Sequence, residues 1–150
     1  MIAKPTEALA ELYEVDETAW LDAMAELLRE ERFSELDYPN LQEHLEAMAL
    51  RDRKKVESRL AILIAQVLKW THQPEKRTPS WRGTIIEQRH GLNKTAGSGS
   101  LRKHAEAVLS DCSAEAVDMA MEETKLPTET FPKECPWTLE QLLSAEVLGE

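Results

Sequence analysis

Six consecutive apolar residues, 60–65 (Leu-Ala-Ile-Leu-Ile-Ala), constrain the fold of this chain more than any other feature. In a helix such a run is apolar on every side, so neighbouring elements must surround it. Strong helix formers dominate the composition, only five glycines are present, and β-branched residues never form an alternating run. We therefore expect an all-α protein, with residues 60–65 helical at the centre of its core.

Periodicity and start signals predict a helical bundle of about four main helices plus a short C-terminal helix. Asp16 is a good N-cap for the first helix. The apolar face expected on that helix consists of Trp20, Ala23, Met24, Leu27 and Leu28. The second helix is the longest and covers about residues 39–72, ending at Gln73-Pro74. Its first part carries one apolar stripe, made of Leu41, Leu45 and Met48.

The sequence predicts three further helix starts after the long helix. Thr78 followed by proline is the cap of a third helix, which ends near Gly91, and Ser100 is the expected cap of a fourth. Thr138 and Gln141 have capping-box spacing for the short last helix. Short loops between helices are typical of a bundle.

The length predicts a single helical domain over residues 1–150, with its core at about 13–145. Residues 96–100 (Ala-Gly-Ser-Gly-Ser) form the expected flexible connector. Residues 51–55 are five charged side chains in a row, so this stretch of the long helix is either solvated or a bend.

Charge is segregated along the chain. Residues 1–50 carry 13 acids and 3 bases, residues 51–104 carry 4 acids and 13 bases, and residues 105–150 carry 11 acids and 2 bases. The outer acidic helices can pack on the basic middle segment, or that segment can remain exposed and receive an anionic partner. The total of −10 argues against broad non-specific binding of nucleic acid.

The chain lacks the marks of secretion and of a membrane span. Glu7 and Glu11 occupy the region where a signal peptide would be apolar, and Gln66 and Lys69 interrupt the most apolar segment. We therefore expect a cytoplasmic protein with no membrane association, whose two cysteines are reduced thiols.

No catalytic constellation, metal-ligand set or nucleotide-binding loop is recognisable, so we expect no cofactor and no metal, and we lean against an enzyme. Glu87 and His90 form one Glu-x-x-His pair, whereas di-iron bundles use two such pairs, and the sequence has no second pair of this kind. His44 lies next to Glu43 and is expected on a solvated helix face.

One stretch combines aromatic and basic residues around a proline-bounded turn. It could hold an anion at the start of the third helix or stack exposed bases. Alternatively, Trp70 and Trp81 close the end of the bundle while the cations pair within the protein. The candidate binding surface consists of Arg59, Lys69, His72, Lys76, Arg77, Trp81, Arg82 and Arg89.

The same regions carry a family resemblance over about residues 13–143. The matching pieces are Tyr13, Asp16 and Trp20; Leu28-Arg29; Leu36-Asp37 with Asn40-Leu41; Ser58-Arg59-Leu60; Leu68-Lys69-Trp70; Gln73-Pro74; Ser80-Trp81; Gln88-Arg89; Phe131-Pro132; and Cys135-Pro136. Together they resemble the domain of unknown function 29 family, helical bacterial proteins mostly of cyanobacteria and proteobacteria. The resemblance implies an almost entirely helical fold and no established biochemistry. Gln66 stands where the family often has histidine, and Gly99 where it often has proline.

The leading functional hypothesis is a non-enzymatic helical module that binds a protein partner or itself. Its basis is the acidic outer helices and the missing catalytic set. The alternative is a nucleic-acid or phosphate-binding helical protein that uses the basic segment at residues 69–82.

Overall fold

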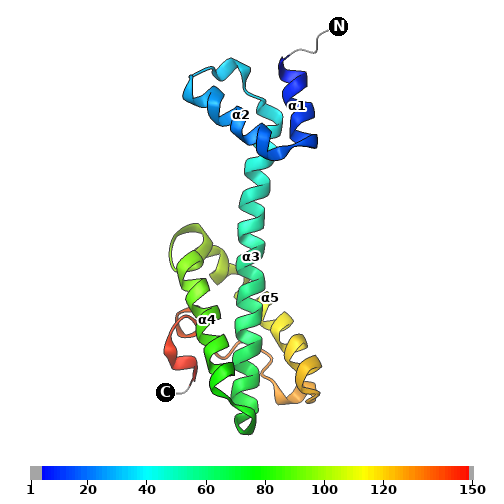
Figure 1. The fold of residues 1–150 in the computed structure, drawn as a ribbon. Helices are drawn as coiled ribbons and strands as arrows, with labels where there is room; N and C mark the ends of the chain where they lie inside the picture. The colour runs from blue at the N-terminus through cyan, green and yellow to red at the C-terminus, as the bar shows by residue number, and fades with distance from the viewer. Residues whose placement is uncertain (1–4, 149–150) are drawn as a thin grey trace. The chain divides into compact units, whose positions relative to one another are not determined.

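The computed structural model describes residues 5–148, and within that range the chain forms helices without any strand (Figure 1). The all-α prediction is therefore confirmed. The α-helices are α1 (Pro5–Val15), α2 (Glu17–Arg29), α3 (Tyr38–His72), α4 (Pro79–Ala96), α5 (Gly99–Thr124) and α6 (Leu139–Leu142). Single turns of 3-10 helix are η1 (Phe33–Glu35), η2 (Pro74–Lys76), η3 (Thr128–Thr130) and η4 (Ala145–Leu148).

The chain divides into two compact units, an N-terminal unit (Met1–Leu50) and a C-terminal unit (Arg51–Glu150). The 35-residue helix α3 contributes its first turns to the former and the rest to the latter. That residues 1–150 behave as one domain stays a prediction.

The N-terminal unit is built around a small core. Trp20, Met24 and Leu36 are its buried hydrophobic residues. Trp20 and Met24 are four residues apart on α2, so they share one face of that helix. The partly buried side chains that pack against them are Leu9, Leu12, Tyr13, Leu27 and Leu41.

The C-terminal unit has the larger core, and residues 60–65 lie within it as predicted. Five of these six residues are buried, and Ile62 is partly exposed. Helices α4 and α5 pack on this part of α3 through Ile85, Leu92 and Ala105 (Figure 1). The C-terminal α6 and η4 add Leu142 and Val147 to the same core. A run that is apolar on nearly every side is thus covered by several neighbouring elements.

The charged residues 51–55 continue α3 without a break, and all five are exposed. The solvated interpretation of this stretch is the correct one. No helix within residues 5–148 combines the length and apolar character that a membrane crossing requires.

Three predicted helix starts are confirmed by their caps. The Asp16 carboxylate accepts a hydrogen bond from the Ala19 backbone N–H at 3.1 Å. The Thr78 hydroxyl accepts one from the Trp81 backbone N–H at 3.0 Å. Thr138 and Gln141 form the reciprocal capping box, with bonds of 3.1 and 2.9 Å. Each cap satisfies backbone donors that have no partner inside the helix.

Several predicted boundaries were wrong. A further helix, α1, precedes Asp16, because Leu9 and Leu12 give it an apolar face against α2. The third predicted helix continues past Gly91 to Ala96, whose methyl group is buried in the core. Burial of this last turn outweighs the low helix propensity of glycine.

The connector expected at residues 96–100 is also shorter than predicted. The cap of α5 is Ser98 rather than Ser100, and its side chain makes no capping hydrogen bond. Gly99 begins α5 with a φ of +72°, a left-handed conformation that proline cannot adopt. The turn between α4 and α5 therefore depends on glycine at this position.

Substitution of leucine by alanine should cost different amounts of stability in the two parts of α3. Leu63→Ala removes a side chain that is 0% exposed and should lower the free energy of unfolding by about 2–5 kcal/mol. Leu45→Ala removes one that is 58% exposed and should change it by no more than about 0.5 kcal/mol. Urea denaturation of the two variants would measure this difference, and equal losses would contradict the assignment of the core.

Candidate functional site

The residues predicted for the binding surface all lie in the C-terminal unit. Lys69 and His72 are in the last turn of α3, Lys76 is in η2, and Arg77 follows it. Trp81, Arg82 and Arg89 are on α4, and Arg59 is near the middle of α3.

The two tryptophans contact each other. The Trp70 and Trp81 ring centroids are 5.4 Å apart in an edge-to-face arrangement. Trp70 belongs to the core and Trp81 packs against it. Both indole N–H groups are buried without a hydrogen-bond partner. The rings therefore pack against each other and the core near the turn between α3 and α4. They do not form an exposed platform on which bases could stack.

Two of the predicted cations are held by the protein itself. Arg77 donates from Nε to the Trp70 carbonyl at 2.8 Å, and its guanidinium carbon lies 4.8 Å from the centroid of the Trp70 ring. Lys69 forms an ion pair with Glu123 of α5, and its Nζ lies 5.6 Å from the Trp81 ring centroid. These contacts hold the turn between α3 and α4 in place by hydrogen bonding and cation–π attraction.

The remaining residues of the predicted surface are dispersed. The His72 ring packs edge-to-face on Phe131 at 5.2 Å, and Lys76 is exposed. The Arg59 guanidinium occupies the space in which a Cβ of residue 91 would lie. Gly91 therefore allows this side chain to lie close to the backbone of α4. Arg89 stands between Ile85 and Leu92 on the inner side of α4, with Nη1 buried and without a hydrogen-bond partner.

Potential metal ligands and cysteine thiols were the other candidates for reactive groups. In residues 5–148, no three His, Cys, Asp or Glu side chains come together as a metal site would require. The Cys112 thiol is buried and donates to the Glu57 carbonyl at 3.5 Å. Desolvation raises the pKa of Cys112 to about 11, and Glu57 adds to the effect. This thiol therefore has little nucleophilic character near neutral pH.

A buried polar cluster joins the helices of the N-terminal unit. The Trp20 indole donates to Asp37 at 3.0 Å, and the Asn40 amide donates to the same carboxylate oxygen at 2.8 Å. Asp37 is 6% exposed, and it links α2 to the start of α3. Residues that carry the family resemblance thus have structural roles here.

His44 belongs to the same region, and its predicted place on a solvated face was wrong. It is buried beside Trp20 and Tyr13, with ring centroids 5.7 and 6.3 Å away. Its Nδ1 lies 3.9 Å from a Glu17 carboxylate oxygen. Aromatic packing by residues from α1 and α2 covers this face of α3.

The N-terminal unit leaves many large apolar side chains uncovered. Within the described residues, every large hydrophobic side chain that is exposed belongs to this unit. These eight residues are Val15, Leu21, Leu28, Phe33, Tyr38, Leu45, Met48 and Leu50. Exposed apolar groups gathered in one region are typical of interaction surfaces.

Two helices carry most of this exposed surface. Leu21 and Leu28 are seven residues apart on α2, and Tyr38 and Leu45 are seven apart on α3, with Met48 one turn further. Residues at this spacing share one helix face. Leu28, which was expected on one apolar face with Trp20 and Met24, is 47% exposed. The apolar stripe on α3 was recognised in the sequence, but only Leu41 packs on the core.

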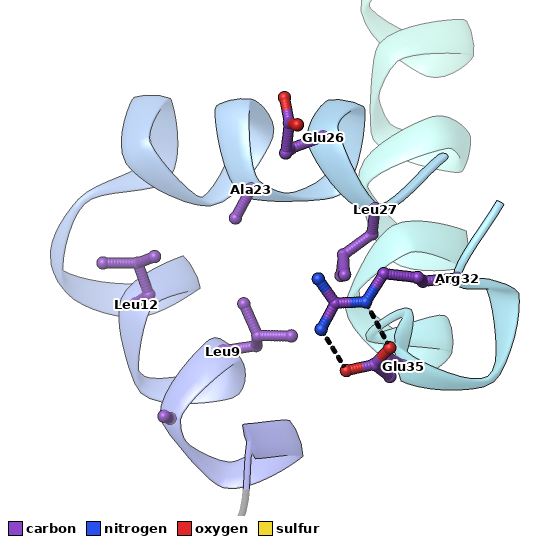
Figure 2. Close-up of a pocket in the computed structure, with 8 residues that line it drawn as sticks. Leu9, Leu12, Ala23, Glu26, Leu27, Arg32 and Glu35 are labelled. Atoms are coloured by element: carbon purple, nitrogen blue, oxygen red, sulfur yellow. Dashed lines mark hydrogen bonds and ion pairs between the residues drawn. The ribbon is translucent and has the colours of Figure 1, made fainter. Parts of the chain in front are cut away.

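An apolar groove lies between α1 and α2, with a volume of about 550 Å³. Its floor is formed by Ala8, Leu9 and Leu12 of α1 with Ala23 and Leu27 of α2. Figure 2 shows Leu9, Ala23 and Leu27 pointing into the space between the two helices.

Charged residues border this groove at Glu26, Arg32 and Glu35. Arg32 donates to both oxygens of Glu35 at 2.5 and 2.6 Å and to Glu30 at 2.7 Å (Figure 2). The hydrogen bonds that Arg32 donates lower the pKa of the Glu35 carboxyl, and the bonds that Glu35 and Glu30 accept raise the pKa of Arg32. The cation at the groove is therefore neutralised by the unit's own acids.

The net charge follows the same division of the chain. The N-terminal unit has 13 acids and 3 bases, a balance of −10, whereas the C-terminal unit has 15 of each. The exposed large hydrophobic side chains among the described residues and the net charge of the protein thus belong to the same fifty residues. The acidic segment was recognised in the sequence, whereas the predicted binding surface lies in the C-terminal unit.

The hydrogen bonds of Asp37 predict a specific loss of stability. Asp37→Ala leaves the buried Trp20 indole N–H without an acceptor and should destabilise the N-terminal unit by about 1–3 kcal/mol. Asp22→Ala, at an exposed position of α2, is the matched control and should have little effect. Thermal denaturation monitored by Trp20 fluorescence, with the other tryptophans replaced by phenylalanine, would report the change. Equal stabilities of the two variants would show that Asp37 is dispensable.

Comparison with known proteins gives one finding. Residues 12–148 match the family model described as "Domain of unknown function DUF29". No curated protein and no solved structure matches the chain. The match covers nearly all of the sequence and agrees with the resemblance noted above, so this chain belongs to the family of the domain of unknown function DUF29.

Proposed function

We propose that this protein is a non-enzymatic helical module that binds another protein, with its binding surface on the N-terminal unit. The observation that carries this proposal is the location of the exposed large hydrophobic residues, all of which lie in that unit among the described residues. Water contact with such side chains is unfavourable, by roughly 1.5–3 kcal/mol for each one that a partner could cover completely. Association would recover part of this free energy.

The size of the unit supports the same proposal. Three hydrophobic side chains are buried in the described part of this fifty-residue unit, so its core is small, and domains of this size commonly gain stability from association. Both of the protein's cysteines lie outside this unit, so it has no disulfide to compensate. A partner that packs on α2 and α3 would extend the core with Leu21, Leu28 and Leu45.

The nucleic-acid or phosphate-binding alternative has less support. Of its proposed cations, Lys69 is paired with Glu123, and Arg77 is bonded to the Trp70 carbonyl. An incoming phosphate would have to displace these contacts. It would also have to approach a protein whose net charge is −10.

Site-specific photo-crosslinking would test the proposed surface. A photoreactive phenylalanine analogue at position 28 or 45 should give covalent adducts with a protein in the native host, because both side chains are exposed. The same analogue at position 107, an exposed alanine of α5, is the control and should give few adducts. Adduct mass would separate a second copy of the chain from a different protein. Adducts at 107 alone, or none at 28 and 45, would refute the proposal.

A further inference from the structure

We propose that the groove between α1 and α2 binds a basic amphipathic helix of a partner protein. The apolar side of that helix would enter between Leu9, Leu12 and Leu27, and its lysine or arginine residues would face the surrounding acids. This inference rests on the proposed function, because it names the partner class for the same N-terminal unit.

The shape and lining of the groove fit apolar side chains. Five of its eight lining residues are alanine or leucine, and its volume is about 550 Å³. Ala8 and Ala23 contribute small side chains to the lining, and Ala23 points into the space between α1 and α2 (Figure 2). Amphipathic helices bind such grooves through anchors at positions i, i+3 or i+4, and i+7. A few leucine-sized anchors are what this groove can accept.

The net charge of the N-terminal unit favours a partner helix that carries positive charge. Exposed acids on α1 and α2 and the residues that join or follow them are Glu7, Glu11, Glu14, Asp16, Glu17, Asp22, Glu26, Glu30 and Glu31. The cation that lines the groove, Arg32, is already bonded to Glu30 and Glu35. The acids that line the groove, Glu26 and Glu35, are paired with Arg29 and Arg32, so the attraction for a cationic helix comes from the excess of acids over bases in the N-terminal unit. Attraction of this kind raises the association rate.

The same charge argues against the other occupants of an apolar groove. A second copy would bring another N-terminal unit of charge −10, and the two acidic surfaces would repel each other. An acidic peptide or an anionic lipid surface would be disfavoured for the same reason. An apolar lining in a unit with a net charge of −10 is complementary to a helix that is apolar on one side and basic on the other.

A designed peptide provides a direct probe. An 18-residue helical peptide with leucine at i, i+3, i+4 and i+7 spacing and lysine elsewhere should bind the full chain, as measured by fluorescence anisotropy. The affinity should fall at least tenfold between 50 and 300 mM salt, because salt screens attraction between exposed charges. The distance over which such charges attract, the Debye length, is about 10 Å at 0.1 M salt and shortens as the salt concentration rises. A peptide with glutamate in place of lysine, and a lysine peptide with its leucines dispersed, should not bind.

A matched pair of protein variants locates the binding. Ala8→Arg fills the groove from an exposed position of α1, and Ala47→Arg makes the same change at an exposed position of α3 outside the groove. Both are conservative for helix formation and change the net charge equally. We expect Ala8→Arg to weaken the lysine peptide at least tenfold, and Ala47→Arg to weaken it less than threefold. Circular dichroism would verify that both variants keep their helices.

Three results would overturn the inference. They are equal binding of the glutamate peptide, equal effects of Ala8→Arg and Ala47→Arg, or self-association of the chain that Ala8→Arg abolishes. The last result would make a second copy the occupant. If these results appear while crosslinking at positions 28 and 45 still captures a protein, the groove assignment fails and the proposed function stands.

Discussion

In the N-terminal unit, the fully buried Trp20 packs with Met24 and Leu36 and donates its indole N–H to Asp37. This contact fastens α2 to the beginning of α3, and the packing of α1 depends on the same small core. Because so few side chains are needed to hold these three helices, many large apolar residues remain outside. A unit of this size has too little interior to bury them all. The exposed surface is therefore a consequence of how little this core encloses.

The two units use the same long helix in opposite ways. From Val56 to Trp70, α3 is covered by α4, α5 and the C-terminal helices, and its large apolar residues are buried or nearly so. In its first turns, Leu45 and Met48 face solvent. The net charge is divided likewise, with −10 on the N-terminal unit and none on the other. The larger core and the exposed large hydrophobic residues thus lie in different parts of the described chain. Under the proposed function, the acidic surroundings would limit which partners the apolar surface can attract.

Local signals in the sequence were sufficient to predict most of the fold. The caps at Asp16, Thr78 and Thr138 act within one turn, so their spacing alone identifies them. The apolar run at residues 60–65 indicated a covered helix, because every face of a helix with this sequence is apolar. An apolar stripe, however, shows which face of a helix is hydrophobic and not whether anything covers it, so the exposure of Leu28, Leu45 and Met48 could not be predicted. The pairing of Lys69 with Glu123 could not be predicted from local signals, because the two residues are 54 positions apart in the sequence.

The most direct test of this account compares two methionines of the N-terminal unit. Met24 is 2% exposed and Met48 is 47% exposed. Hydroxyl-radical footprinting of the free protein at low concentration, read by mass spectrometry, should oxidise Met48 much faster than Met24, with Phe33 and Tyr38 also reactive. Comparable protection of Met24 and Met48 would mean that this surface is already covered, and the proposed interaction surface would not exist.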